Sequence, residues 1–421
     1  MINYVNLVHP KAKFSIQQHG HNTVCAQASK RLNNTQAPHR PLRAVILAAL
    51  ELNLSTSSRQ APNMAEHLSD AENHFDSSQT SILTRSSQAF NTQVLPLMRD
   101  ISVETADLMR EARAALGIFK LPGNDRQIGV HEHWIDVYRL LDAMLEGAKI
   151  SGGERYTASV IIAATINKND GGIKQLVSVA QDWLFRLLWP IVIAFKSKEE
   201  PTSDFTTPTI RDSEVLANPV PKNRPSSFHD KIIERRHQCA MSHLWERGYK
   251  GEEVPQNAKY SFLEATHFLR RSIMSGEGTG VKYELPATLD MLSHYAALPK
   301  DLLDDFSAQL DAPENGMMLR PDLHQAYDHF WFCLLATEET NVYTIRWFGD
   351  IVDAGVGFSE VRFTDHSRHG IPLPNPKFIA IQAAIAHVLH LSGAGEVIDA
   401  VIDRFFRDGV VPAGRITDMM T

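Results

Sequence analysis

The chain has 421 residues, of which 43% are hydrophobic and 22% charged, and its formal net charge is −7. These values exclude a wholly disordered or fibrous chain, and the length allows two to three domains. The three cysteines (Cys25, Cys239 and Cys333) are widely separated, so they support neither a disulfide framework nor a cysteine-based zinc site. We therefore expect an intracellular protein of the cytoplasm or nucleus.

The charge balance bears on partners and location. Residues 231–349 contain 12 Lys+Arg against 17 Asp+Glu, which argues mildly against nucleic acid as a partner. The first 50 residues contain six Lys+Arg and no acidic residue before Glu51, the charge bias of a transit peptide, so organelle import is an alternative location. The most apolar stretch, 176–195, is interrupted by charged residues and Pro190, so we expect no contact with a membrane.

The first half of the chain is expected to hold a polar segment, a helical region and a linker. Residues 1–95 show no sustained hydrophobic period, which predicts poor order. Residues 96–195 form a predicted helical region, because apolar residues recur at helical spacing along 100–119, 134–145 and 173–188, with a kink or stop before Pro190. Five prolines within 196–230 predict a flexible linker over residues 196–227.

The second half, residues 228–415, is predicted to be a separate domain. Short aromatic and β-branched runs at 330–335 and 342–347 predict a β-hairpin. Two apolar-periodic stretches, 376–391 and 395–406, predict a helical hairpin that closes against this domain. The fold class expected for the whole chain is α+β, rich in helices.

One group of residues carries a pattern typical of metal-assisted chemistry. His267 follows an apolar, strand-like run, and Asn315-Gly316 supplies a tight turn before the short strand 317–319. A helix starting near Leu323, with Asp322 as its N-cap, would place His324 and Asp328 one turn apart on one face, where both can bind a single divalent cation. Such a cation neutralises charge on a scissile phosphate, and a neutral imidazole, here His267, can take a proton from the attacking water.

Four short segments, in this order, resemble the HNH endonuclease domain, especially the form found in fungal, mainly basidiomycete, proteins. They are Cys-Ala-Met-Ser at 239–242, Glu-Ala-Thr-His at 264–267, Glu-Asn-Gly-Met-Met-Leu at 314–319 and Leu-His-Gln-Ala-Tyr-Asp at 323–328. Flanking features also look similar, including Leu-Pro-Asn-Pro at 373–376 and Gly-Glu-Arg-Tyr at 153–156. The resemblance implies a ββα-metal core with flanking helices.

The resemblance also implies roles for single residues. His267 stands at the position of the general base, and Asn315 at that of the asparagine that braces the two-strand loop and orients the base. His324 and Asp328 stand at the positions of metal ligands. Thr266 occupies a position where many HNH enzymes place an Asp or His ligand, so Glu264 is the candidate third ligand.

The predicted function is therefore a metal-dependent endonuclease that hydrolyses phosphodiester bonds in nucleic acid, with DNA favoured over RNA. Mg²⁺ is the favoured metal, with Mn²⁺, Ni²⁺ and Zn²⁺ as alternatives. Arg270, Arg271 and Arg320 flank the predicted site and are candidates for phosphate contacts. The alternative is a catalytically inactive interaction module with the HNH fold, supported by the acidic balance and by Thr266. The sequence does not indicate an oligomeric state.

Overall fold

The computed structural model describes residues 90–166, 170–196, 227–275, 277–278, 281–349 and 356–408. All of them belong to a single compact unit, residues 63–421. Most of the segment expected to be poorly ordered, the basic first 50 residues and the core of the predicted linker lie outside the described residues. The division of the chain into domains therefore stays a prediction.

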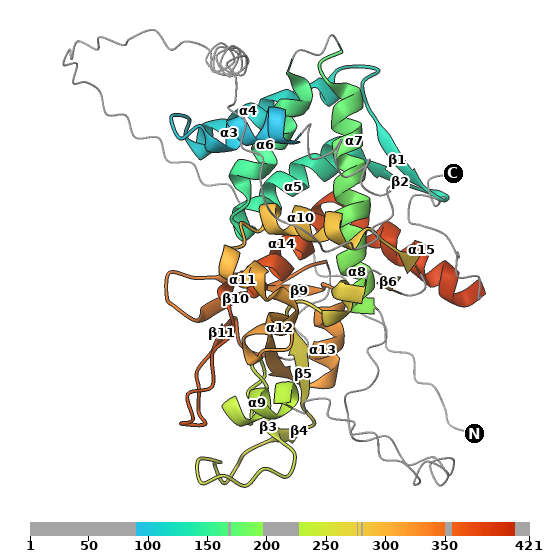
Figure 1. Ribbon diagram of the computed structural model, residues 1–421. Coiled ribbons are helices and arrows are strands. Elements are labelled where there is room, and N and C mark those ends of the chain that lie inside the picture. The colour runs from blue at the N-terminus through green and yellow to red at the C-terminus, as the bar shows by residue number, and fades with distance from the viewer. Residues whose placement is uncertain are drawn as a thin grey trace, which may run out of the picture. The chain divides into compact units, whose positions relative to one another are not determined.

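The predicted helical region contains helices with one intervening hairpin (Figure 1). Its α-helices are α3 (Leu95–Arg99), α4 (Thr105–Leu116), α5 (Val137–Ser151), α6 (Glu154–Thr165), α7 (Ile173–Trp183) and α8 (Trp189–Lys196). The strands β1 (Gln127–Val130) and β2 (His133–Asp136) pair antiparallel where the sequence predicts the start of a helix. Trp134 is thus a strand residue, 63% exposed. Helix α5 starts only after Asp136, whose carboxylate accepts a hydrogen bond from Arg139 N at 2.7 Å.

Pro190 does not end the helix that precedes it. The helical run continues from Ile173 to Lys196, with a π-helical turn, Leu184–Leu188, just before the proline. A wider turn accommodates a residue that lacks a backbone N–H, so of the predicted kink or stop before Pro190 the stop is wrong. By length and composition this run could cross a membrane, but 67% of its apolar window is buried inside the protein, as in the core helix of a globular domain.

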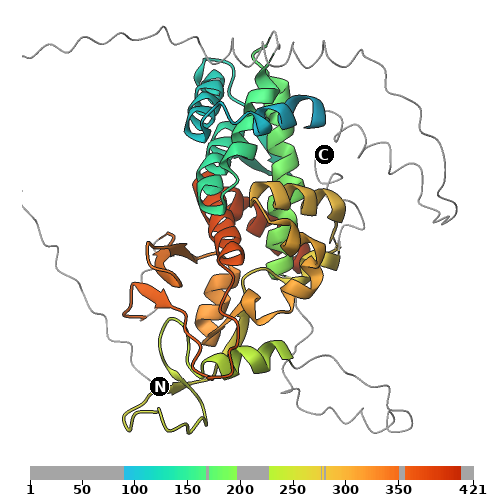
Figure 2. The same cartoon turned by 60° about the vertical axis from the view of Figure 1, so that its left-hand side comes forward.

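The C-terminal helices form a corner. Helix α14 (Pro376–Ser392) packs against both α5 and the strand β9 (Phe332–Ala336), so one core joins the helical region to the second half of the chain (Figure 2). Helix α15 (Ala394–Asp408) leaves α14 at 90°. Gly393, with φ at 76°, makes this turn. The predicted helical hairpin is therefore wrong in its angle, although both helices are present.

The second half of the chain mixes short strands and helices, in agreement with an α+β class. The predicted hairpin is confirmed, because β9 pairs antiparallel with β10 (Val342–Trp347). In chain order the other elements are α9 (Ser227–Arg235), β3 (Trp245–Glu246), β4 (Tyr260–Ser261), β5 (Glu264–His267), β6 (Glu277–Gly278), β7 (Val281–Lys282), α10 (Leu285–Tyr295), α11 (Lys300–Asp304), α12 (Phe306–Leu310), β8 (Gly316–Leu319), α13 (Pro321–Asp328) and β11 (Glu360–Arg362).

The antiparallel pair β5–β8 positions the candidate site. Glu264 pairs with Leu319 and His267 with Gly316. Helix α13 follows β8 directly and begins at Pro321, two residues before the predicted start, because proline suits the first turn of a helix. Asp322 consequently lies inside the first turn, where its carboxylate accepts a hydrogen bond from Arg320 Nε at 2.7 Å instead of capping the helix.

Candidate functional site

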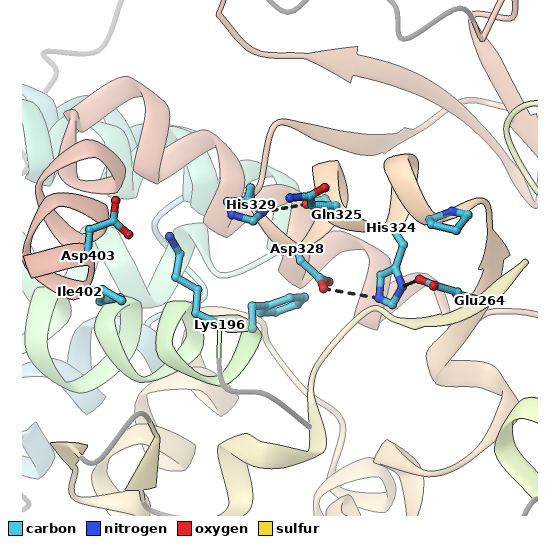
Figure 3. A pocket seen from close by; sticks show the side chains of 10 residues that line it. Lys196, Glu264, His324, Gln325, Asp328, His329, Ile402 and Asp403 are labelled. Carbon is cyan, nitrogen blue, oxygen red and sulfur yellow. Dashed lines mark hydrogen bonds and ion pairs between the residues drawn. The ribbon is translucent and has the colours of Figure 1, made fainter. Parts of the chain in front are cut away.

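His324 of α13 lies between two carboxylates (Figure 3). Its Nδ1 is 2.7 Å from Glu264 Oε2 on β5, and its Nε2 is 3.4 Å from Asp328 Oδ2, one helical turn further along α13. The hydrogen bond from His324 lowers the pKa of the Glu264 carboxyl, so this side chain is ionised at neutral pH. An ionised partner at Nδ1 favours the proton on that nitrogen, which leaves Nε2 as a hydrogen-bond acceptor.

A single cationic group already contacts both of these acceptor atoms. The Nη2 of Arg270 lies 3.1 Å from His324 Nε2 and also forms an ion pair with Asp328 Oδ2. The Arg270 side chain is 8% exposed and that of Asp328 19%, so water screens this charge pair only weakly. The imidazole and carboxylate thus converge on one positively charged atom.

The donor set at this point fits a divalent cation in part. An imidazole nitrogen and a carboxylate oxygen one turn apart on a helix are ligands that Mg²⁺, Mn²⁺ and Zn²⁺ accept. Glu264 forms a hydrogen bond with Nδ1 of the imidazole, the nitrogen that faces away from Asp328. In metal sites a carboxylate at this position orients the histidine ligand. Across the described part of the chain, no three His, Cys, Asp or Glu side chains are arranged together to hold a metal ion.

His267 lies on the opposite face of the strand pair. Side chains alternate between the two faces of a strand, and Glu264 and His267 are three residues apart. The His267 ring stacks on Phe228 of α9, with the ring centroids 3.8 Å apart and the planes at 4°, and the residue is 8% exposed. Its strand partner Gly316 faces the same helix, since a Cβ built there would lie 2.5 Å from Phe228 and Ile232. Helix α9 therefore covers the His267 face, and α13 covers the Glu264 face.

Asn315 fastens the chain immediately after His267. Its side-chain amide is fully buried, accepts a hydrogen bond from Leu269 N at 3.0 Å and donates to Leu269 O at 2.8 Å. The backbone carbonyl of Asn315 also accepts a hydrogen bond from Phe268 N at 2.9 Å. These bonds hold the end of β5 against the turn before β8.

A buried arginine of α9 fastens the other side of this turn. Arg235 is 3% exposed and donates to three backbone carbonyls, those of Pro313 at 2.9 Å, Gly316 at 2.6 Å and Pro372 at 2.9 Å. Burial lowers the pKa of its guanidinium to about 10. Arg235 therefore supports β8 and is not available to a ligand at the surface.

The other two arginines proposed for phosphate contacts have ion-pair partners elsewhere, although the backbone carbonyl of Arg320 accepts a hydrogen bond from His324 N at 2.9 Å. Arg271 forms an ion pair with Asp311 and keeps 59% of its side chain exposed. Arg320 is paired with Asp322. Of the three candidates, Arg270 is the one whose guanidinium is described in contact with the side chains of His324 and Asp328.

An open hollow of about 400 Å³ lies beside His324 and Asp328. Part of its wall comes from the end of α8, with Phe195 and Lys196, and part from α15, with Ile402 and Asp403 (Figure 3). Sequence reasoning missed these residues, because they are more than 60 positions from α13 and carry no motif. His267 is not among the residues that line the hollow.

Comparison with known proteins agrees with the position of this site. Residues 239–335 match the family model described as HNH endonuclease. The matched segment contains β5, β8 and α13 and leaves helices α3–α8 and α14–α15 outside. It identifies an HNH domain in this part of the chain and supports a nuclease-type function, for which a divalent metal and a nucleic acid substrate are typical. No curated protein and no solved structure matches the chain, and nothing in these findings supports the fungal part of the resemblance.

Proposed function

We propose that this protein is a metal-dependent endonuclease that hydrolyses phosphodiester bonds at the hollow beside α13, with DNA as the favoured substrate. The observation that carries the proposal is the convergence of His324 Nε2 and Asp328 Oδ2, 3.4 Å apart, on one cationic atom inside the segment that matches the HNH endonuclease family. The strand pair β5–β8 followed by α13 would then be the ββα core of this domain.

Four residues of the candidate site would have defined tasks. His324 and Asp328 would hold the divalent cation, which supplies charge neutralisation at the scissile phosphate when bound. Glu264 would keep the proton of His324 on Nδ1, so that Nε2 remains available. Arg270 would move from these ligands to the phosphate and carry its positive charge with it, since guanidinium groups bind phosphate oxygens in pairs of hydrogen bonds.

His267 would be the general base, on the sequence resemblance and on the support that Asn315 gives to the end of β5. Proton removal from water requires the imidazole to reach the hollow. Its stacking on Phe228 on the other face of the strand favours a second candidate, an HNH-fold interaction module without catalysis. The pairing of Arg270 with Asp328 favours the same alternative, because it satisfies the ligand charge from within the protein.

The deciding experiment combines cleavage with metal binding. Purified protein is incubated with duplex DNA, single-stranded DNA and RNA, each with Mg²⁺, Mn²⁺, Ni²⁺ or Zn²⁺, and metal binding is titrated by calorimetry on the same preparation. For His324→Ala, we expect metal affinity and cleavage to fall together, because one of few protein ligands is lost. Cleavage that is absent with every metal, beside unchanged metal binding in His324→Ala, would favour the interaction module.

A matched control is available on α10. His294 lies one helical turn from Asp290, with Nδ1 and Oδ1 3.6 Å apart, so it repeats the helix-borne His–Asp pair outside the hollow. His294→Ala should leave metal affinity and cleavage at the level of the parent protein. Equal losses in both variants would mean that histidine removal acts through stability and not through the site.

A further inference from the structure

The short ribbon β3–β4 carries three aromatic side chains and one arginine on one of its faces. The strands pair in parallel, with Trp245 opposite Tyr260, and partners in a pair lie on the same face. Just beyond the ends of these two-residue strands, the Arg247 guanidinium lies 4.9 Å from the ring centroid of Phe262. We call these four side chains, Trp245, Arg247, Tyr260 and Phe262, the aromatic face of the ribbon.

This face is open to solvent. Phe262 is 63% exposed and Tyr260 47%, both large values for side chains with so much apolar area. The ring of Trp245 is packed against other rings: it stacks with Tyr249, with the ring centroids 5.9 Å apart, and Tyr249 stacks with His237, with the centroids 3.7 Å apart. A supported platform with exposed rings is suited to bind flat partners without rearrangement.

The ribbon lies directly before the candidate site in the chain. Phe262 precedes Glu264 by two residues, about 7 Å of extended backbone. Glu264 in turn contacts His324 beside the hollow. A strand of nucleic acid bound on the aromatic face would therefore lie close to the hollow.

We propose that the aromatic face binds single-stranded nucleic acid by stacking unpaired bases on Phe262 and Tyr260, with Arg247 at the adjacent phosphate. The inference rests on the proposed function for the class of partner, and it adds a preference for unpaired bases. Exposed aromatic rings accept any base by stacking, whereas the bases of a duplex are already stacked on one another and cannot reach the rings. The preference should therefore concern strandedness and not sequence.

The test measures binding alone, with the full chain and without metal. Fluorescence anisotropy in EDTA is recorded for a labelled oligothymidylate and for a duplex of the same length. The parent protein should bind the single strand more tightly. Phe262→Ala should weaken single-strand binding roughly 5- to 150-fold, the range for loss of one stacked base. Phe262→Tyr should preserve it, since the tyrosine ring stacks equally well.

Two further variants separate stacking from other causes. Trp134→Ala removes a ring that is also 63% exposed but lies on β2, so it should leave the affinity unchanged. Phe262→Leu keeps apolar area without an aromatic ring and should behave like Phe262→Ala. The proposal is overturned if Phe262→Leu binds the single strand as tightly as the parent does, because apolar area without a ring would then be sufficient. It is also overturned if the duplex and the single strand bind equally well.

Failure of this proposal and failure of the proposed nuclease give different results. If the parent cuts nucleic acid and Phe262→Ala binds single strands normally, the nuclease proposal stands and the binding proposal is wrong. If the parent never cuts but binds single strands through Phe262, the binding proposal stands and the nuclease proposal is wrong.

Discussion

The two faces of the strand pair β5–β8 differ in chemistry although the motif residues on them are neighbours in sequence. On the α9 face, His267 is packed flat against Phe228 and the glycine opposite it leaves room for that helix. On the α13 face, Glu264, His324 and Asp328 form a charged chain beside an open hollow. One strand thus separates a histidine that is packed against an aromatic ring from a histidine that lies between two carboxylates beside a hollow.

The difference shows that order in the sequence is a weak guide to which motif residues act together. His324 and Asp328 share a helix face because the α-helix repeats nearly every four residues. Glu264 and His267 are separated by strand alternation, so the same motif that predicts a common site also predicts opposite faces. The following predictions test how far this separation holds, from the largest effect to the smallest.

The largest effect is expected for replacement of the packed histidine. His267→Phe retains a ring to stack on Phe228 but removes the proton acceptor. If His267 is the general base, cleavage should fall by about 10²- to 10⁴-fold while calorimetry shows metal binding like that of the parent. Cleavage at the parental rate would show that the histidine only packs, and the separation of the two faces would then be functional as well as geometric.

Next in size is the charge pair on the open face. Arg270→Met leaves the half-buried carboxylate of Asp328 without its cation, so unfolding in EDTA should require less free energy, by at most the ~3–5 kcal/mol of a fully buried pair. Added Mn²⁺ should recover more stability in the variant than in the parent, because the ion binds only the folded state and replaces the missing charge. Thermal unfolding with and without metal measures both effects.

The control for this variant is its neighbour in sequence. Arg271→Met breaks the pair with Asp311, which is far more exposed, and should change stability by at most about 1 kcal/mol, without a metal-dependent recovery. If metal stabilises Arg270→Met no more than the parent, Arg270 does not compete for the ligands.

A smaller effect is expected for the carboxylate that orients His324. Glu264→Gln keeps the shape of the side chain but no longer fixes the proton on Nδ1, so metal affinity should fall by about 10- to 100-fold. Calorimetric titration of Mn²⁺ gives this ratio directly. A complete loss of binding would instead make Glu264 a ligand itself, as the sequence suggests.

The smallest effect concerns pH. The hydrogen bond from His324 lowers the pKa of Glu264 below its ordinary value of 4.5, so its contribution to stability is present above that value. It is lost as the pH falls through the lower pKa of the folded state. The urea midpoint of the parent should exceed that of Glu264→Gln at about pH 7, and the two should converge by about pH 3. If the urea midpoints still differ in acid, the stability difference comes from the shape of the side chain and not from its charge.

Several elements could be predicted from the sequence because their signals are local. The pairs and helices at 332–336, 342–347, 376–392 and 394–408 follow from apolar periodicity and turn residues. Two local predictions failed: the β1–β2 hairpin replaced the start of a helix, and α14 and α15 met at a right angle instead of forming a hairpin. At Pro190, where a kink or a stop was predicted, a π-helical turn carries the helix through the proline.

The sequence by itself determined that His324 and Asp328 share one helical face, because their spacing of four residues places them one turn apart. Only the tertiary structure decided that Arg270 satisfies this pair, that Glu264 binds the other nitrogen of the imidazole, and that α8 and α15 complete the hollow. These contacts join residues 54 to 60 positions apart or more, where side-chain packing and burial of charge, and not local conformational preference, select the partners.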